Sequence, residues 1–349
     1  MPEPRQRFLV IRLSSIGDIV HALPAVAALG ETYPQAEIHW AVESRYAALL
    51  EGNPFVHRAV KLDTLAWRRK LTSPTVIEEI VPAIRSLRKA RFDAALDFQG
   101  LYKSALIARL SGAGVRLGFA ENWLREPAAG AFYTEHVAPR GRGHVIEMNL
   151  ALVERLEVRR LDRAGWRFPL PQNPADDEYI GRQIAALEGR EFIVINPGGG
   201  WMSKCWAPES YADLIRRLPP EFSGEVLLTG SRDEEEMMRG IIRQSGSPRV
   251  RSIPTTILQF IALVKRAKLF LGGDTGPLHL AAAVRTPIVA IYGPTDPMRN
   301  GPFSKDDVTL WNREPTTYTR RAERPAYLQG ITVDSVVEAI RKRLARAHG

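Results

Sequence analysis

The chain has 349 residues, which is longer than one hydrophobic core usually serves, so the length predicts two domains. Its composition, 45% hydrophobic and 25% charged, is typical of a soluble globular protein, and its longest apolar run, residues 19–30, is too short to span a membrane. Lysine and arginine outnumber the acids by 48 to 39, and the net charge of +9 predicts a surface that attracts anions. No pattern of a nucleic-acid-binding module is present, so we do not expect nucleic acid as a partner. The partner that we expect instead is an anionic membrane surface or a phosphorylated substrate.

The N-terminus and the cysteine usage indicate the compartment. Arg5 and Arg7 precede an apolar run, but Arg12 interrupts it after four residues and no A-x-A cleavage site follows, so we predict no signal peptide. Cys205 is the one cysteine of the sequence and can form no internal disulfide. A cytoplasmic protein is therefore expected.

Apolar strand patterns alternate with amphipathic helix patterns through both halves of the chain. In chain order, the first half contains strand patterns at residues 7–13, 37–43, 93–98 and 115–119, and helix patterns at 22–33, 74–90 and 102–112. The second half contains strand patterns at 191–196, 225–230, 269–273 and 287–293, and helix patterns at 208–218, 233–244, 257–267 and 277–284. This alternation predicts an α/β fold, with parallel sheets covered by helices on both faces.

A stretch rich in proline and polar residues, 168–178, is the predicted linker between the halves. It divides the chain into an N-terminal domain of residues 1–170 and a C-terminal domain of residues 171–349. The last helix pattern, residues 333–347, has one apolar and one basic face. It could pack on either domain, including back on the N-terminal one, or lie against a membrane.

An acid, Asp18, stands in the first turn of the helix that follows the first strand. Ser15 and Asp18 fit the spacing of a capping box, in which two side chains satisfy backbone N–H groups of the helix start. A carboxylate at the carboxyl end of a parallel strand also stands where open α/β sheets bind their ligands. Taken alone, the segment favours the cap and leaves catalysis open.

Two strands of the second half end in glycine-rich turns that suit an anion. The first leads into Gly198–Gly200 and then Lys204, and the second into Asp274 and a helix that opens with Pro277. A tight loop explains the first turn and a helix cap the second without any ligand. The sequence has no dinucleotide-binding fingerprint after a strand, no P-loop and no cluster of metal-ligand spacing, so we predict no metal site.

Seven segments, taken in order, resemble the ADP-heptose:lipopolysaccharide heptosyltransferases, glycosyltransferase family 9. They are SSIGDIVHALP (14–24), DFQGLYKSA (97–105), NWLREPAAGAFY (122–133), INPGGGWMSKCWAPESYADL (195–214), LTGSRDEEE (228–236), LGGDTGPLHLAAA (271–283) and IYGPTDP (291–297). The second and third look most like heptosyltransferase I. The resemblance implies a GT-B fold, in which two Rossmann-like domains face each other across a cleft, the first binding the acceptor and the second the nucleotide sugar.

The resemblance also implies roles for individual residues. Asp18 would be the general base that takes the proton of the attacking acceptor hydroxyl, and Lys204 the cation on the diphosphate. The donor-binding positions that it implies, besides Lys204, are Gly199, Gly200, Glu234, Thr256, Asp274, Thr275, Gly276 and His279.

Four of these positions match the family pattern less directly. Gly199 and Gly200 stand where some relatives carry threonines, so only their backbone amides could contact phosphate. Glu234 aligns with an acid that contacts the ribose, but three acids in a row also favour a helix N-terminus. Thr256 ends the segment expected near the adenine.

The acceptor is expected to meet arginine and lysine, because guanidinium groups bind carboxylate and phosphate bidentately. The resemblance implies Arg68, Arg69, Lys70 and Arg125 for this role. A charge run is also commonly a solvated face, which remains the alternative for residues 68–70. Gln99 and Lys103 could line the same cleft or serve packing.

The implied activity is an inverting, metal-independent transfer of heptose from ADP-L-glycero-D-manno-heptose to Kdo of lipid A. It needs no cofactor beyond the nucleotide-sugar substrate, and it would take place in the cytoplasm at the anionic surface of the inner membrane. The alternatives are a GT-B transferase with another ADP- or UDP-sugar, for example one like heptosyltransferase II, and a nucleotide-sugar-binding protein without catalysis.

Overall fold

The computed structural model describes residues 5–69, 74–141, 143–199, 204–313, 328 and 330–346. The chain forms two compact units, Met1–Pro171 and Gln172–Gly349, so the observed boundary lies one residue from the predicted one. The predicted linker is shorter than expected, because α6 (Pro174–Ala185) begins inside it. Asn173 caps this helix by accepting a hydrogen bond from Ala175 N at 3.0 Å, and a proline fits its first turn.

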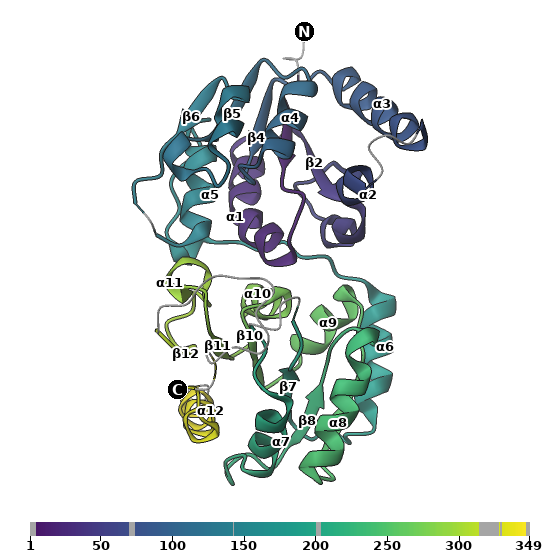
Figure 1. Cartoon of the computed structure of the whole chain (residues 1–349), viewed down its shortest axis with the longest axis vertical. Coiled ribbons are helices and arrows are strands. Elements are labelled where there is room, and N and C mark those ends of the chain that lie inside the picture. The colour runs from purple at the N-terminus through teal and green to yellow at the C-terminus, as the bar shows by residue number, and fades with distance from the viewer. Residues whose placement is uncertain are drawn as a thin grey trace. The chain divides into compact units, whose positions relative to one another are not determined.

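The first unit is built on a six-stranded parallel sheet of order β3-β2-β1-β4-β5-β6 (Figure 1). Its strands are β1 (Arg7–Ile11), β2 (Glu37–Glu43), β3 (Arg58–Leu62), β4 (Ala94–Asp97), β5 (Val115–Phe119) and β6 (Glu135–Val137). Its helices are α1 (Ile16–Thr32), α2 (Thr64–Arg69), α3 (Pro74–Lys89), α4 (Tyr102–Leu110) and α5 (Val145–Glu154), with the 3₁₀ turns η1 (Ser44–Leu50), η2 (Glu121–Trp123), η3 (Pro127–Phe132) and η4 (Arg163–Gly165).

The second unit repeats this plan, with a parallel sheet of order β12-β11-β10-β7-β8-β9. Its strands are β7 (Phe192–Asn196), β8 (Glu225–Leu228), β9 (Val250–Ser252), β10 (Leu269–Gly273), β11 (Ile288–Tyr292) and β12 (Val308–Trp311). Besides α6, its helices are α7 (Pro208–Arg216), α8 (Glu235–Ser245), α9 (Ile257–Val264), α10 (Gly276–Ala283), α11 (Pro297–Asn300) and α12 (Val333–Ala345), and η6 (Arg232–Glu234) precedes α8. Both sheets confirm the predicted α/β class.

The final helix belongs to the second unit. Val336, Ala339 and Ile340 of α12 are buried in the core of that unit, and in Figure 1 the helix, drawn in yellow, lies near β12. Arg343 Nε donates to Asp307 Oδ1 at 3.0 Å, and both side chains are buried. The expectation that this helix could pack back on the N-terminal domain is therefore corrected, because its apolar face fills the core of the C-terminal one.

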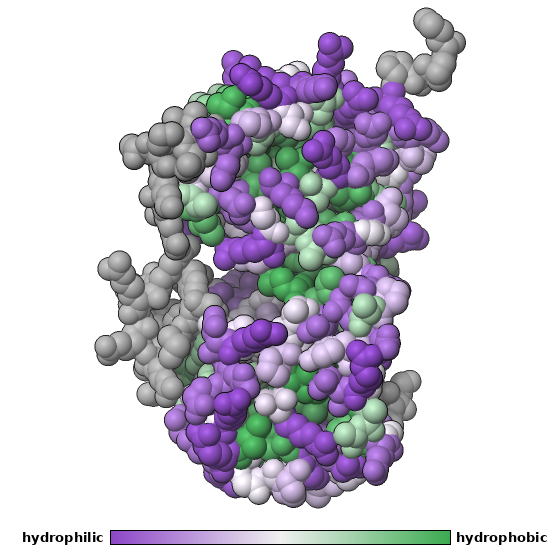
Figure 2. Space-filling view, turned by 90° about the vertical axis from the view of Figure 1, so that its right-hand side faces the viewer, coloured by the Kyte–Doolittle hydropathy of each residue, from purple (hydrophilic) through white to green (hydrophobic). Residues whose placement is uncertain are grey.

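Among the described helices, none combines the length and the apolar character needed to cross a membrane. On the face drawn in Figure 2, hydrophilic residues predominate within each unit and hydrophobic residues are scattered among them.

Candidate active site

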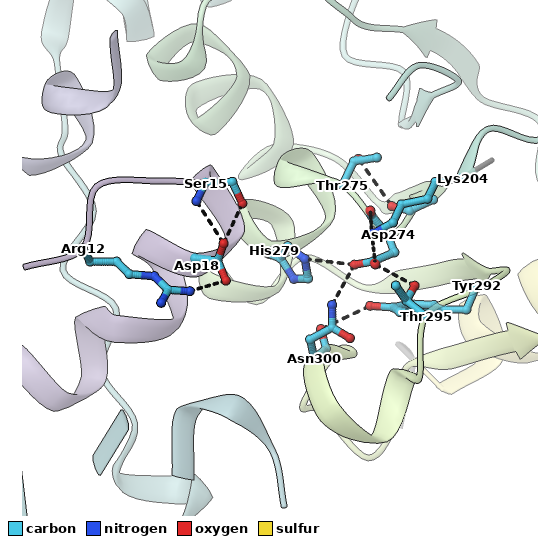
Figure 3. A network of polar contacts seen from close by, with 11 residues as sticks. Arg12, Ser15, Asp18, Lys204, Asp274, Thr275, His279, Tyr292, Thr295 and Asn300 are labelled. Atoms are coloured by element: carbon cyan, nitrogen blue, oxygen red, sulfur yellow. Dashed lines mark hydrogen bonds and ion pairs between the residues drawn. The ribbon is translucent and has the colours of Figure 1, made fainter. Parts of the chain in front are cut away.

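The first group of functional side chains surrounds Asp18, at the carboxyl end of β1 (Figure 3). The Ser15 backbone N–H and the Ser15 hydroxyl both donate to Asp18 Oδ2, each at 2.9 Å, and Arg12 Nη2 forms an ion pair with Oδ1. Asp18 therefore does cap α1, as the capping-box spacing of Ser15 and Asp18 predicted. The cap uses one oxygen, and 40% of the side chain stays exposed, so capping and catalysis are compatible.

The surroundings of Asp18 keep its carboxyl group ionised. Partial burial by itself raises the pKa of Asp18, but the Arg12 guanidinium and the two Ser15 hydrogen bonds outweigh it, and the pKa lies below its ordinary value. A base must be unprotonated to accept a proton, so this carboxylate is available at neutral pH.

The end of β4 braces the loop that carries Asp18. Gln99 Oε1 accepts a hydrogen bond from Leu13 N at 2.8 Å, which ties the β1–α1 loop to the β4–α4 loop. Asp97, fully buried, accepts from Gln99 N at 2.8 Å and from the Tyr133 hydroxyl at 2.8 Å. Burial raises the pKa of Asp97 above its ordinary value. Gln99 thus supports the loop, which is the packing role weighed for it from the sequence.

The residues expected for the acceptor are only partly described. Arg125 is exposed between η2 and η3, and the next residue, Glu126, accepts a hydrogen bond from Tyr102 N at 2.7 Å, which holds this segment to the start of α4. Arg68 and Arg69 belong to α2, but their side chains lie outside the described residues, as does Lys70. Lys103 Nζ donates to Thr64 Oγ1 at 3.0 Å and so ties α4 to α2.

The second group of side chains surrounds Asp274, which follows β10 in the second unit (Figure 3). Asp274 Oδ2 accepts from Lys204 Nζ at 2.5 Å and from Thr295 Oγ1 at 2.7 Å. Oδ1 accepts from Asn300 Nδ2 at 2.9 Å and lies 3.2 Å from His279 Nε2. Burial by itself raises the pKa of Asp274, but His279 and Lys204 outweigh it and hold the pKa far below the ordinary value.

This arrangement gives Asp274 a different task from direct contact with an anion. Each of its oxygens already faces two donors, which fills the four lone-pair positions of a carboxylate. Asp274 is therefore an anchor that fixes Lys204 and His279. Besides Asp274, this group of residues offers an anion the positive charge of Lys204 and the N-terminus of α10, which starts at Gly276 with Thr275 at the N-cap position.

A glycine allows Lys204 to reach this position. A Cβ added to Gly273 would lie 2.5 Å from the Lys204 carbonyl oxygen, so the chain at Lys204 crosses the end of β10 at a distance that a side chain would prevent. The glycine at position 273 is thus explained by close backbone approach.

Glu234 takes the position of a cap and at the same time covers the glycine turn. Its Oε2 accepts from Ser231 N at 2.7 Å and from Ser231 Oγ at 2.8 Å. Its Oε1 lies only 1.7 Å from the position that a Cβ on Gly198 would take. The capping interpretation is confirmed, and Oε1 remains near the turn, where the ribose contact was expected.

The other positions expected to bind the donor have local structural contacts of their own. The Thr256 hydroxyl accepts a hydrogen bond from Gln259 N at 3.3 Å as the cap of α9, so its oxygen already serves the helix. The Gly199 carbonyl accepts a weak hydrogen bond from Cys205 Sγ at 3.8 Å, and Gly200 lies outside the described residues. Within the described part of the chain, no group of three or more His, Cys, Asp or Glu side chains is arranged to hold a metal ion.

Sequence reasoning missed three residues of these groups: Arg12, Thr295 and Asn300. Thr295 lies in the IYGPTDP segment, which contributed only to the family resemblance. Asn300 lies 26 positions from Asp274 and carries no local signal. Arg12 was noted only as the charge that interrupts the first strand, yet a charge inside such a run signals a buried ion pair.

Comparison with known proteins agrees with the fold. The sequence model described as "Glycosyltransferase family 9 (heptosyltransferase)" matches residues 80–328. Lipopolysaccharide heptosyltransferase 1 of Pseudomonas aeruginosa is 28% identical over 311 residues, covering 87% of this chain and 83% of that protein. The protein of the same name from Escherichia coli K12 is 29% identical over 305 residues, covering 86% of this chain and 92% of that protein. The solved structure of E. coli heptosyltransferase WaaC with ADP-2-deoxy-2-fluoro heptose has a TM-score of 0.74 at 26% identity, covering 97% of this chain and 99% of that one. The family match spans well over half of the chain, which therefore belongs to glycosyltransferase family 9, has the GT-B fold and is a glycosyltransferase.

Proposed function

We propose that this glycosyltransferase moves heptose from ADP-L-glycero-D-manno-heptose to Kdo of lipid A during assembly of the lipopolysaccharide core. The proposal is supported by the names of its relatives and by the ADP-sugar analogue bound in the E. coli structure. The observation that carries it is the anchored lysine: Lys204 is held by Asp274 beside the N-terminus of α10.

The leaving group explains why this site suits an ADP-sugar. When the bond from the anomeric carbon to the diphosphate breaks, its electron pair leaves with ADP, and negative charge grows on the phosphate oxygen. A fixed ammonium group and the N–H groups of a helix start stabilise that charge without further reorganisation. Lys204 and the start of α10 at Gly276 would do this without a metal ion.

The attacking group needs a base, and Asp18 is suited to that role. The hydroxyl of Kdo loses its proton to the Asp18 carboxylate, and the oxygen forms the new bond to the anomeric carbon from the face opposite to ADP. The product then has the inverted configuration. Asp18 is ionised and 40% exposed, which meets the two requirements of such a base.

The acceptor is an anion at a membrane surface, and the chain is basic. Kdo carries a carboxylate and lipid A carries phosphates, and Arg125 together with residues 68–70 would bind them. A net charge of +9 would hold the protein at the anionic cytoplasmic face of the inner membrane.

The test is a transfer assay with the purified full chain, ADP-heptose and Kdo–lipid A, followed by mass spectrometry of the product. We expect one heptose per acceptor, unchanged turnover after treatment with EDTA, and an inverted anomeric configuration by NMR. A parallel reaction with heptosyl-Kdo–lipid A separates the first heptose transfer from the second. Turnover only with that longer acceptor, or only with another nucleotide sugar, would overturn the proposal.

A further inference from the structure

Arg12 is a buried arginine that connects the end of the first strand to the candidate base. It directly follows β1, and its side chain is almost fully buried. Its backbone is fixed on one side, since Trp40 Nε1 donates to Arg12 O at 3.1 Å. Its guanidinium makes two contacts: Nη1 donates to the Phe98 carbonyl, and Nη2 forms the ion pair with Asp18 Oδ1.

The hydrogen bonds of Asp18 leave one lone pair for chemistry. A carboxylate oxygen can accept two hydrogen bonds. Oδ2 of Asp18 already accepts two, from the N–H and the hydroxyl of Ser15, whereas Oδ1 accepts one, from Arg12. Counting only the described residues of the first unit, the acceptor position left on this exposed carboxylate is therefore on Oδ1.

Arg12 lowers the stability of the core in which it lies. Its Nε is buried and has no hydrogen-bond partner in the described part of the chain. A buried donor without a partner destabilises the folded state, and an apolar side chain of similar size would avoid that cost. The guanidinium is thus poorly explained by stability, and its contact with Asp18 points to the reaction.

We propose that Arg12 is a positioning residue for the transfer, which holds Asp18 so that Oδ1 is the atom that takes the acceptor's proton. This inference rests on the proposed function, in which Asp18 is the base. In the step, the proton passes from the acceptor hydroxyl to Asp18 Oδ1 and a lone pair of the hydroxyl oxygen forms the new bond to the anomeric carbon. The bond from that carbon to the diphosphate breaks, and its electron pair leaves with ADP. The Arg12 N–H stays bound to Oδ1 throughout and keeps the carboxylate from rotating.

The charge of Arg12 has a second consequence, which can be measured. Two groups face Asp18: Arg12 from the end of β1 and Tyr46 from η1. Burial raises the pKa of the Tyr46 hydroxyl, which therefore stays neutral. Loss of the guanidinium would leave a partly buried carboxylate whose burial raises its pKa. Since the base must be ionised, the acidic limb of the rate profile would then move to higher pH.

The experiment compares R12Q, R12K and the matched control R7Q in the full-length enzyme. Arg7 lies on the same strand, but its Nε pairs with Glu37 Oε2 at 3.0 Å at the amino end of the sheet. For each variant we measure kcat and kcat/KM from pH 4 to 9, and the pKa of the Asp18 carboxyl by NMR with ¹³C-labelled aspartate. The Asp18 signal is identified by its loss in D18N.

For R12Q we expect a lower kcat, unchanged KM for the donor, and a rise of about 1 unit or more both in the acidic limb and in the Asp18 pKa. R12K keeps the charge but replaces the planar fork, whose two nitrogens contact Phe98 and Asp18, by a single ammonium group. The acidic limb of its pH profile should therefore stay in place while kcat falls about tenfold. R7Q should match the original chain. If R12Q does not fold, R12K still decides the positioning role.

The inference and the function on which it rests can fail separately. An unshifted Asp18 pKa in folded R12Q, or a full kcat in R12K, would overturn the role of Arg12, while inactive D18N would still support the base. Full activity of D18N would overturn the base assignment and the inference with it.

Discussion

The Lys204 ammonium group and the Asp274 carboxylate form a buried ion pair, with 2.5 Å between Nζ and Oδ2. The Asp274 side chain is 2% exposed, and His279 Nε2 lies 3.2 Å from its other oxygen. In D274N, Lys204 and His279 would face a neutral amide inside the protein. Breaking a buried pair costs about 3–5 kcal/mol, so we expect a loss of that order in the free energy of unfolding, measured by urea denaturation.

The stability lost in D274N should depend on pH. The pKa of folded Asp274 is held far below the ordinary value of 3.8, against the direction in which burial acts, by His279 and Lys204. A carboxyl group with a lowered folded pKa stabilises the fold above its unfolded pKa and loses that contribution as the pH falls through the folded pKa. The stability difference between the original chain and D274N should be equal at pH 7 and pH 5 and narrow only below about pH 4. A difference that already shrinks between pH 7 and 5 would contradict the anchored, ionised Asp274.

Replacing the lysine instead of the acid should separate activity from stability. In K204M the Asp274 carboxylate keeps its bonds from Thr295 and Asn300 and its contact with His279, so stability should fall less than in D274N. The leaving diphosphate loses its fixed cation, and we expect kcat to fall by about 10² to 10³.

The control for K204M is K268M in the same unit. Lys268 Nζ pairs with Glu191 Oε1 at 2.6 Å at the amino end of the sheet, away from Asp274. We expect K268M to keep full transfer activity. Equal losses in the two variants would mean that Lys204 has no special role with the donor.

The neutral donors on Asp274 should act through that carboxylate. T295V removes the hydroxyl that donates to Oδ2 at 2.7 Å. A hydrogen bond to a charged group contributes about 1.5–3 kcal/mol, so we expect a loss of this size in stability and weaker binding of ADP by calorimetry. In a double-mutant cycle, T295V should cost clearly less in the D274N background. Additive losses would show that Thr295 acts independently of Asp274.

The strands show how far the sequence pattern reaches. It located the four inner strands of each sheet, because runs such as β7 and β10 are buried along their whole length. It missed β3, β6, β9 and β12, which are the edge strands of the two sheets. All four are short or half-exposed, and an edge strand needs no continuous apolar run.

The site shows a similar division between local and distant information. Asp18 and Lys204 could be found because a strand end, a glycine turn or a helix start marks them in the sequence. The contact of Asn300 with Asp274 could not be predicted, because a turn after β11 brings it there from 26 positions away. For Glu234, the sequence left a cap and a ribose contact open; the structure shows that the cap uses Oε2, while Oε1 lies over Gly198.

The last prediction concerns Gly198, over which that carboxylate lies. In G198A the new methyl group would meet Glu234 Oε1, 1.7 Å from the ideal Cβ position, so Glu234 must move away from the turn. Because Oε1 is the end of a flexible side chain that caps Ser231, we expect a loss of stability no larger than that of a helix cap, about 0.5–2 kcal/mol, and a raised KM for the donor. The matched control is G240A in α8, where nothing lies within 4 Å of an added Cβ. Alanine favours a helix over glycine, so G240A should gain up to about 1 kcal/mol and keep its KM. E234A would remove both the clash and the cap on Ser231, so G198A should cost clearly less stability in the E234A background than in the original chain. Additive losses would contradict the close packing of these two residues.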